Sequence, residues 1–214
     1  MHTLLDHQFR YFNLLLAQMT ITAFDFDGTI TTKDTLLTFI KFSKGTWPFL
    51  VGFFLYSPLL IAYKLRLYPN WKVKQHIFSY FYKGTSIDQF NQWGAAFSER
   101  IAKIVRPRAL TAIHTHQQEG CVLVIVSASV ENWITPWAAG QGIDRVLATQ
   151  VEIDQQGKLT GKFLTKNCYG REKVNRILEV FPRRADYKLL AYGDSRGDLD
   201  LIEFADEGYY HKFK

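Results

Sequence analysis

Cysteine is scarce in this chain of 214 residues: it occurs twice, at Cys121 and Cys168, and neither position has metal-site spacing. Thiol chemistry is therefore not expected, and a reducing cytoplasm is the simplest location. A secretory signal is also missing, because Asp6 and Arg10 precede the apolar residues 14–16 and no cleavage pattern follows. We expect Met19, just before the first predicted strand, to be the true start, with residues 1–18 as an upstream extension.

Long uninterrupted apolar runs are missing as well. The stretch 47–63 contains no charged residue, but Pro48, Gly52 and Pro58 interrupt it. A single spanning helix needs about 20 apolar residues, so this stretch is both short and broken. The chain also shows no internal repeat and no low-complexity linker. These absences direct attention to an ordinary globular organisation.

The composition supports that organisation. Hydrophobic residues make up 47% of the chain and aromatic residues 15%, which excludes a disordered protein. The formal net charge is +6, and this favours anionic partners in general: phosphorylated metabolites, anionic lipid surfaces or nucleic acid. The net charge alone does not distinguish among these partners, and ordinary surface lysines account for it equally well. Because nucleic acid gains no other support, we do not expect it as a partner.

Three short apolar runs predict buried strands, at 21–26, 121–126 and 187–192, and the stretches 146–153 and 158–163 predict two paired strands. They alternate with helical patterns, which indicates an α/β fold with a mostly parallel sheet. A long helical stretch at 35–105 contributes no alternating strands. We therefore predict one domain made of 1–34 and 106–214, and a smaller helical domain at 35–105 inserted after the first strand.

Polar side chains follow each predicted strand. Asp25 and Asp27 end the first, Ser127 ends the second, and Asp194 follows the third, while Lys173 begins a later helix. Ligands bind beyond the carboxyl ends of strands in an open parallel sheet. These elements are therefore expected to converge at one edge of the sheet.

The residue types at this edge predict phosphoryl transfer. Crowded carboxylates repel one another, and Mg²⁺, which prefers oxygen ligands, relieves the repulsion. Asp25 and Asp194 are the expected carboxylate ligands, and Asp25 is also the expected nucleophile. Asp27 is placed to protonate the leaving oxygen and then to activate water.

Further residues are expected to hold the phosphoryl group. Ser127 and Lys173 can bind its oxygens, where charge must be stabilised. Gly28 leaves the backbone free to approach phosphate closely, and Ala128 is a second candidate contact to substrate. Asp198 follows Asp194 on the same loop or at the start of the next helix.

The ordered set resembles the haloacid dehalogenase-like hydrolase superfamily over about residues 22–210. The motifs that carry the likeness are DFDGT at 25–29, Ser127 in VIVSAS, Lys173 in GREK, and GDSRGD at 193–198. The resemblance implies a Rossmann-like three-layer α/β/α core, Mg²⁺ as cofactor and Asp25 as nucleophile. It also implies Asp27 as acid/base and as a metal ligand through its backbone carbonyl. In the last motif it implies Asp194 as a metal ligand and Asp198 as the residue that supports it.

Each residue also has a structural interpretation. Asp25 and Asp27 are turn formers after a strand in that alternative, and Ser127 is a helix N-cap. Lys173 alone is typical of a solvated helix residue, and Asp198 of a helix cap. The ordered set of four motifs favours the catalytic interpretation.

The helical insert resembles the cap of the phosphoserine-phosphatase-like branch, subfamily IB. That branch recognises its substrate with a glutamate after the first motif, near Asp34 here, and with a cap arginine. No arginine occurs between Trp71 and Lys83, where His76 or Phe78 is the aligned position. Free phosphoserine is therefore not expected as the substrate.

The stretch 47–63 offers another substrate class. An apolar, aromatic segment beside basic residues can rest on an anionic bilayer at the inner face of the membrane. A lipid phosphate head group is then within reach of Asp25. A related branch similar to phosphatidylglycerophosphatase C has such an apolar cap. The alternative is that the segment packs as a buried helical hairpin, with a small phosphorylated metabolite as substrate.

We therefore predict a Mg²⁺-dependent phosphomonoester hydrolase. One alternative is a catalytically silent membrane-associated or regulatory protein that keeps the fold. Another is a phospho-accepting receiver domain, which the spacing of 25–29 and the insert disfavour.

Overall fold

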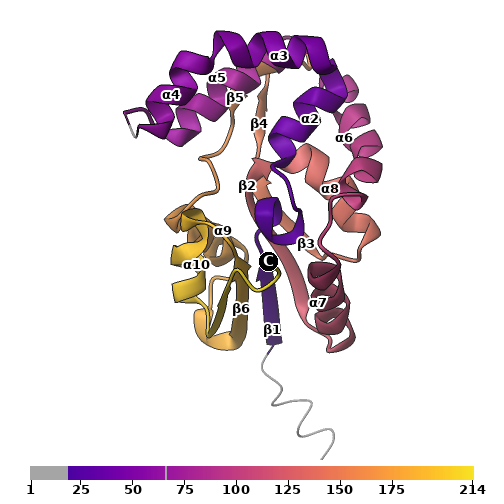
Figure 1. Ribbon diagram of the computed structural model, residues 1–214. Coiled ribbons are helices and arrows are strands. Elements are labelled where there is room, and N and C mark those ends of the chain that lie inside the picture. The colour runs from indigo at the N-terminus through magenta and orange to yellow at the C-terminus, as the bar shows by residue number, and fades with distance from the viewer. Residues whose placement is uncertain (1–18, 66) are drawn as a thin grey trace, which may run out of the picture.

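A five-stranded sheet lies at the centre of the molecule (Figure 1), and the computed structural model describes residues 19–65 and 67–214. The strand order is β3-β2-β1-β6-β7, and every neighbouring pair is parallel. The strands are β1 (Met19–Phe24), β2 (Val122–Val130), β3 (Arg145–Thr149), β6 (Tyr187–Gly193) and β7 (Glu207–Tyr210). The predicted α/β class with a mostly parallel sheet is confirmed.

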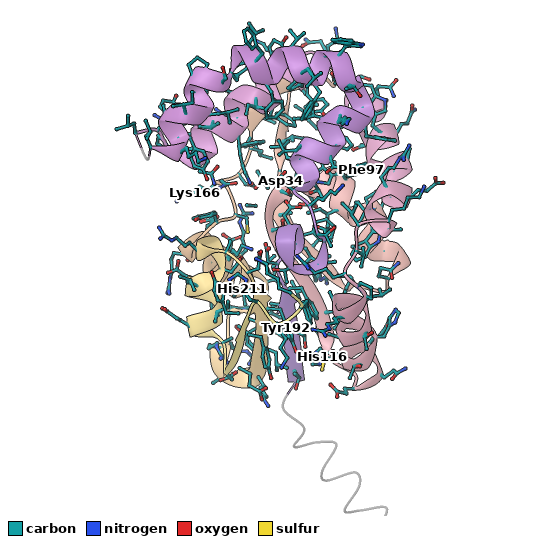
Figure 2. The ribbon with its side chains drawn as sticks, in the orientation of Figure 1. Asp34, Phe97, His116, Lys166, Tyr192 and His211 are labelled. Carbon is teal, nitrogen blue, oxygen red and sulfur yellow. The ribbon has the colours of Figure 1, made fainter. Side chains whose placement is uncertain are left out.

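Successive side chains of each strand point to opposite faces of the sheet, and each face packs against its own layer of helices. Ile21 and Ala23 of β1 face one side and pack with α9 (Arg171–Val180) and α10 (Leu199–Phe204). Phe24 faces the other side, where the cluster includes residues of α7 (Pro107–Gln118) and α8 (Glu131–Gly140). Helices thus cover both faces of the sheet, as in a Rossmann-like three-layer arrangement. Figure 2 shows one link between layers, in which His116 of α7 lies beside Tyr192 of β6 with 3.0 Å between Nε2 and the hydroxyl oxygen.

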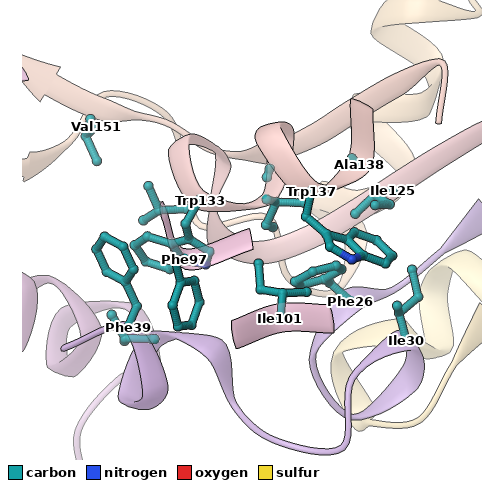
Figure 3. Close-up of a cluster of buried hydrophobic side chains, with 14 of the residues drawn as sticks. Phe26, Ile30, Phe39, Phe97, Ile101, Ile125, Trp133, Trp137, Ala138 and Val151 are labelled. Carbon is teal, nitrogen blue, oxygen red and sulfur yellow. The ribbon is translucent and has the colours of Figure 1, made fainter. Parts of the chain in front are cut away.

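Five helices stand between β1 and α7. They are α2 (Thr35–Lys44), α3 (Thr46–Leu55), α4 (Ser57–Lys64), α5 (Asn70–Tyr82) and α6 (Ile87–Ala102). Figure 1 shows α3, α4 and α5 at the end of the molecule toward which β1 points. Aromatic side chains attach this group to the sheet domain: the Phe39 ring of α2 stacks on Trp133 of α8 with centroids 4.6 Å apart (Figure 3). This stacking fixes α2 above the carboxyl end of the sheet.

A small antiparallel hairpin, β4 (Val151–Ile153) and β5 (Leu159–Phe163), leaves the main sheet and joins the inserted helices. Its backbone bonds to the link between α5 and α6, where Gly84 N–H donates to Leu159 O at 2.8 Å and Leu159 N–H donates to Thr85 O at 2.9 Å. The hairpin therefore ties the later part of the chain to the helical insert.

The element boundaries differ from the sequence expectations in three places. β1 ends at Phe24, and residues 26–30 form a tight turn in which Gly28 has a φ of +84°. β2 continues to Val130, so Ser127 lies inside it. The expected strand 146–153 divides into β3 and β4, which pair with different strands. The predicted upstream extension 1–18 lies outside the described residues, so the start at Met19 stays a prediction.

Candidate active site

Three adjacent strands bring the first polar residues together. Phe24 of β1 pairs with Ile125 of β2 on one side and with Tyr192 of β6 on the other. Asp25 follows directly, and its N–H donates to Tyr192 O at 2.9 Å. The chain extends to one side of β1 through β2 and β3 and to the other through β6 and β7, so β1 marks the topological switch point. This is where open α/β sheets bind ligands.

Lys173 is the buried cation of the site. Its Nζ lies 2.5 Å from Asp25 Oδ1, 2.6 Å from Asp198 Oδ1 and 2.6 Å from the carbonyl oxygen of Val126. Burial alone lowers the pKa of Lys173, but the two carboxylates more than offset it and hold the pKa above its ordinary value. Lys173 therefore stays charged, as a buried cation between two carboxylates does.

The environment of Asp25 shifts the pKa of its carboxyl group. Burial raises its pKa to about 7, while the Lys173 ammonium acts in the opposite direction and the nearby Asp198 charge adds to the rise. A carboxylate so placed is poorly solvated. It is stabilised in its charged form by cations and not by water.

Asp27 is held by a separate set of donors. The Thr35 N–H donates to Asp27 Oδ1 at 2.9 Å, and the Ser129 hydroxyl donates to Oδ2. Burial, followed by the Asp34 charge, raises the pKa of Asp27 to about 6, and the bonds from Ser129 and Thr35 lower it. The Trp133 indole N–H donates in turn to Thr35 Oγ1 at 3.1 Å. Asp27 is therefore fixed in place and titrates near neutrality.

Asp198 and Asp194 complete an acidic cluster with Asp25. Each of the three offers a carboxylate oxygen, and these oxygens lie within 4.8 Å of one another. Asp198 Oδ2 accepts bonds from the N–H groups of Asp194 at 3.1 Å and Ser195 at 2.8 Å, and Lys173 engages its Oδ1. Burial raises the pKa of Asp198, but Lys173 and Ser195 lower it below the usual range.

The cluster fits a hard divalent cation by the chemistry of its donors. Mg²⁺ binds oxygen ligands, usually one or two carboxylates with water and phosphate oxygens. Asp198 is the least available of the three, because the buried Lys173 ammonium and two backbone N–H groups hold its oxygens. Within the described part of the chain, the oxygens of Asp194 contact only the Thr29 hydroxyl and the partly exposed Lys214. Asp25 and Asp194 are therefore the carboxylates best placed to bind such an ion.

Gly28 brings the turn after β1 against Asp194. Its φ is +84°, and an added Cβ would overlap the Asp194 carboxylate. The Thr29 hydroxyl donates to Asp194 Oδ1 at 3.3 Å. The sequence predicted that Gly28 allows close approach to phosphate; the close approach that the structure shows is to the Asp194 carboxylate.

One cavity of about 550 Å³ collects most of the predicted residues. Those on its wall are Asp25, Asp27, Asp34, Ser127, Ala128, Lys173 and Asp198. Gly28 and Asp194 instead line an adjoining crevice together with residues 211–214. The strand and loop residues that sequence analysis singled out thus gather at one place, in two neighbouring hollows.

Several lining residues escaped sequence analysis. Lys74 of α5 reaches the cavity wall, whereas His76 is exposed and Phe78 is buried in the core. Tyr169 also lines the cavity. Ser129, which donates to Asp27, does not line the cavity, and the register of β2 against β3 shifts between Ser127 and Val130, so strand alternation gave no signal for it. Lys74 had no signal either, because its approach depends on how α5 packs.

Comparison with known proteins identifies the family. The sequence model of haloacid dehalogenase-like hydrolases matches residues 22–203. The chain belongs to the haloacid dehalogenase-like hydrolase family. Among curated members, Protein CicA of Caulobacter vibrioides is 36% identical over 197 residues, which cover 91% of this chain and 86% of CicA.

Solved structures share the fold of this hydrolase. A Bordetella pertussis protein of unknown function has a TM-score of 0.77 at 18% identity, with 88% of each chain covered. A phosphoserine phosphatase solved as a phospho-aspartyl intermediate analogue has a TM-score of 0.60 at 19% identity, and covers 90% of this chain and 85% of its own. The predicted likeness to phosphoserine-phosphatase-like family members is confirmed for the fold.

Proposed function

We propose that this hydrolase is a Mg²⁺-dependent phosphatase that cleaves phosphomonoesters through an aspartyl-phosphate on Asp25. One observation carries the proposal: Asp25, Asp27, Ser127 and Lys173 line a single cavity, with Lys173 ion-paired to Asp25 at its inner end. Family membership and the phosphatase among the structural neighbours support it.

The chemistry assigns one task to each of two carboxyl groups. An oxygen of Asp25 attacks phosphorus, the ester P–O bond breaks, and protonated Asp27 gives its proton to the leaving oxygen. Asp27 carboxylate then takes a proton from water as that water attacks phosphorus. The acyl-phosphate bond breaks, which releases phosphate and restores Asp25. The pKa of Asp27, about 6, suits a group that must act as acid and as base.

Ser127 and Lys173 bind the phosphoryl oxygens in this proposal, and Ala128 with Gly28 borders their path. Asp25 and Asp194, with the backbone carbonyl of Asp27, would hold Mg²⁺, and Asp198 would support them. When bound, Mg²⁺ offsets the combined negative charge of the carboxylates and the phosphoryl group. The Asp198 carboxylate holds the Lys173 ammonium in place through an ion pair, and it holds the backbone at 194–195 by accepting from two N–H groups.

The division into two domains is part of the proposal. The predicted division is 1–34 and 106–214 as the catalytic core and 35–105 as the cap. Among the described residues, the core begins at Met19, and the β4–β5 hairpin bridges core and cap. The cavity supports this division, because its floor comes from strand ends and its opposite wall from α2 to α5. Asp34, at the junction, caps α2 by accepting from Leu37 N–H at 3.1 Å.

The cavity wall also bears on the substrate. The cap side of the cavity suits the apolar leaving group of a lipid phosphate better than the leaving group of a small phosphorylated metabolite. That side is lined by Leu36, Leu37, Phe53, Leu60, Val73 and Ile77. Lys74 supplies a cation on the same wall. A lipid phosphate is therefore the second candidate substrate, and it places the protein at the inner face of the cytoplasmic membrane.

Turnover of p-nitrophenyl phosphate tests the function. We expect many turnovers per enzyme with Mg²⁺, none after chelation by EDTA, and none for Asp25→Asn with Mg²⁺. Asp88→Asn, which changes an exposed carboxylate on α6, serves as the matched control and should keep full activity. An absence of turnover on this ester and on a panel of metabolite and lipid phosphates would favour the catalytically silent alternative. Stoichiometric labelling alone would favour a receiver domain.

A further inference from the structure

Helix α3 is apolar on all sides and yet lies on the surface. Its sequence, TWPFLVGFFL, contains no charged residue, and Gly52 is its one buried residue. Such a helix normally occupies a protein interior or another apolar environment. The exposed apolar side chains follow helical spacing along one face: Trp47, Leu50, Val51, Phe54 and Leu55. Trp47 and Phe54 are each 79% exposed.

The opposite face of α3 accounts for its attachment to the cap. Gly52 meets α5 so closely that an added Cβ would overlap the Phe81 ring. Phe49 and Phe53 pack against the core cluster from the same face. The outer face of α3 is therefore a second apolar surface, and it takes no part in the packing of α3 onto the cap. Ile61 of α4, which is also exposed, extends this outer surface.

The charged residues of the sequence segment that contains α3 and α4 all have one sign. Between residues 35 and 87 the sequence contains no aspartate and no glutamate. The same interval holds seven basic residues: Lys41, Lys44, Lys64, Arg66, Lys72, Lys74 and Lys83. An exposed apolar face on a segment whose charges are all positive is complementary to a surface that is apolar within and anionic outside.

We infer that the outer face of α3 and α4 docks on an anionic phospholipid bilayer. Within the described ranges, no lone helix has the length and hydropathy to cross a membrane. The joined pair α3 and α4 is bent by 60°, and Figure 1 shows it along the outer edge of the cap. This geometry fits a bent pair of helices that lies in the membrane–water interface. Trp47, at the start of α3, suits that location because tryptophan is favoured at the interface.

The docking face adjoins the cavity. Phe53, Leu60 and Tyr63 of the same two helices line the cavity that contains Asp25. The bilayer would therefore be separated from the cavity by one layer of helices. That consequence for substrate access rests on the proposed function, whereas the docking itself does not.

Vesicle flotation with the full chain tests the inference without any turnover. We expect binding to vesicles that contain phosphatidylglycerol and much weaker binding to vesicles of phosphatidylcholine alone. The double variant Trp47→Ser with Phe54→Ser should weaken binding by roughly tenfold or more, because two large side chains leave the interface. Leu164→Ser, which removes an exposed apolar side chain elsewhere, is the matched control and should bind normally.

A second pair of variants tests the charges. Lys64→Gln with Lys72→Gln should weaken binding to the anionic vesicles, whereas Lys103→Gln with Arg108→Gln, an equal loss of exposed charge near α7, should not. Circular dichroism and p-nitrophenyl phosphate turnover report whether each variant keeps its fold. The inference is overturned if the wild-type chain does not float, if it floats equally with neutral vesicles, or if Trp47→Ser with Phe54→Ser floats unchanged. A dimer lost in that variant, without vesicle binding, would assign the face to a second copy instead.

Discussion

Lys214 Nζ lies 3.0 Å from Asp194 Oδ2, so a second ammonium group, besides that of Lys173, contacts the acidic cluster. The Phe213 ring supports this position by stacking on Tyr192, with centroids 5.0 Å apart and an interplanar angle of 18°. Lys214 therefore competes for the charge of a carboxylate that we propose as a Mg²⁺ ligand.

The first prediction concerns that competition. Lys214→Met should raise the affinity for Mg²⁺ by roughly two- to fivefold, the size of one partly exposed charge pair. Isothermal titration with Mg²⁺ measures it in the absence of substrate. Lys212→Met is the control, since Lys212 lies over the Tyr209 ring, 5.3 Å from its centroid. An unchanged or weaker affinity in Lys214→Met would show that the lysine does not compete.

A second prediction isolates the role of Gly28. Gly28→Ala should lose Mg²⁺ binding and activity, because the new methyl group overlaps Asp194. Gly84→Ala is a close control: its φ of +82° imposes the same backbone strain, but nothing lies within 4 Å of the added atom. Both variants should lose about 1 kcal/mol of unfolding free energy from strain. Equal Mg²⁺ affinities in the two variants would contradict the proposed crowding.

The third prediction concerns the donors that hold Asp27. Ser129→Ala removes a hydrogen bond that lowers the pKa of Asp27, so that pKa should rise above its value of about 6. A general acid works while protonated, and activity is lost as pH rises through its pKa. The falling limb of kcat/KM should therefore move to higher pH. Thr111→Ala on α7 should leave the pH profile in place, and a profile unchanged in Ser129→Ala would remove Ser129 from this role.

A fourth prediction tests the contact between cap and core. Phe39→Ala removes a fully buried ring that stacks on Trp133, and it should cost about 3–5 kcal/mol of unfolding free energy. Urea denaturation followed by tryptophan fluorescence measures the loss. Leu37→Ala, on the partly exposed side of α2, should cost clearly less. Similar losses in the two variants would mean that the ring stack does not anchor α2.

Sequence analysis located much of this site because charged residues are conspicuous after apolar strands. Asp25, Asp27 and Asp194 stand where buried strands end, and a parallel sheet brings such ends to one edge. Lys173 was predicted as a site residue only because of its place in the ordered set of motifs. Its buried position between two carboxylates is a property of the packed structure.

What sequence analysis missed depends on packing that local patterns do not encode. Ser129 of β2 and Thr35 of α2 hold Asp27 from two elements that are distant in sequence, and they meet only after α2 packs on β2. The run 146–153 is apolar enough for one strand, but pairing partners decide that it forms two. The apolar stretch 47–63 was expected either buried or at a membrane, and the structure places one face of it in contact with the cap and the other in solvent.

Trapping the acyl-phosphate tests the central claim most directly. Borohydride reduces an acyl-phosphate to an alcohol, so enzyme quenched during turnover with Mg²⁺ and p-nitrophenyl phosphate should carry homoserine at position 25. Peptide mass spectrometry should find that product in the wild-type chain, and none in enzyme quenched without substrate or in Asp25→Asn. Continued turnover with an unmodified residue 25, or full activity in Asp25→Asn, would contradict the account.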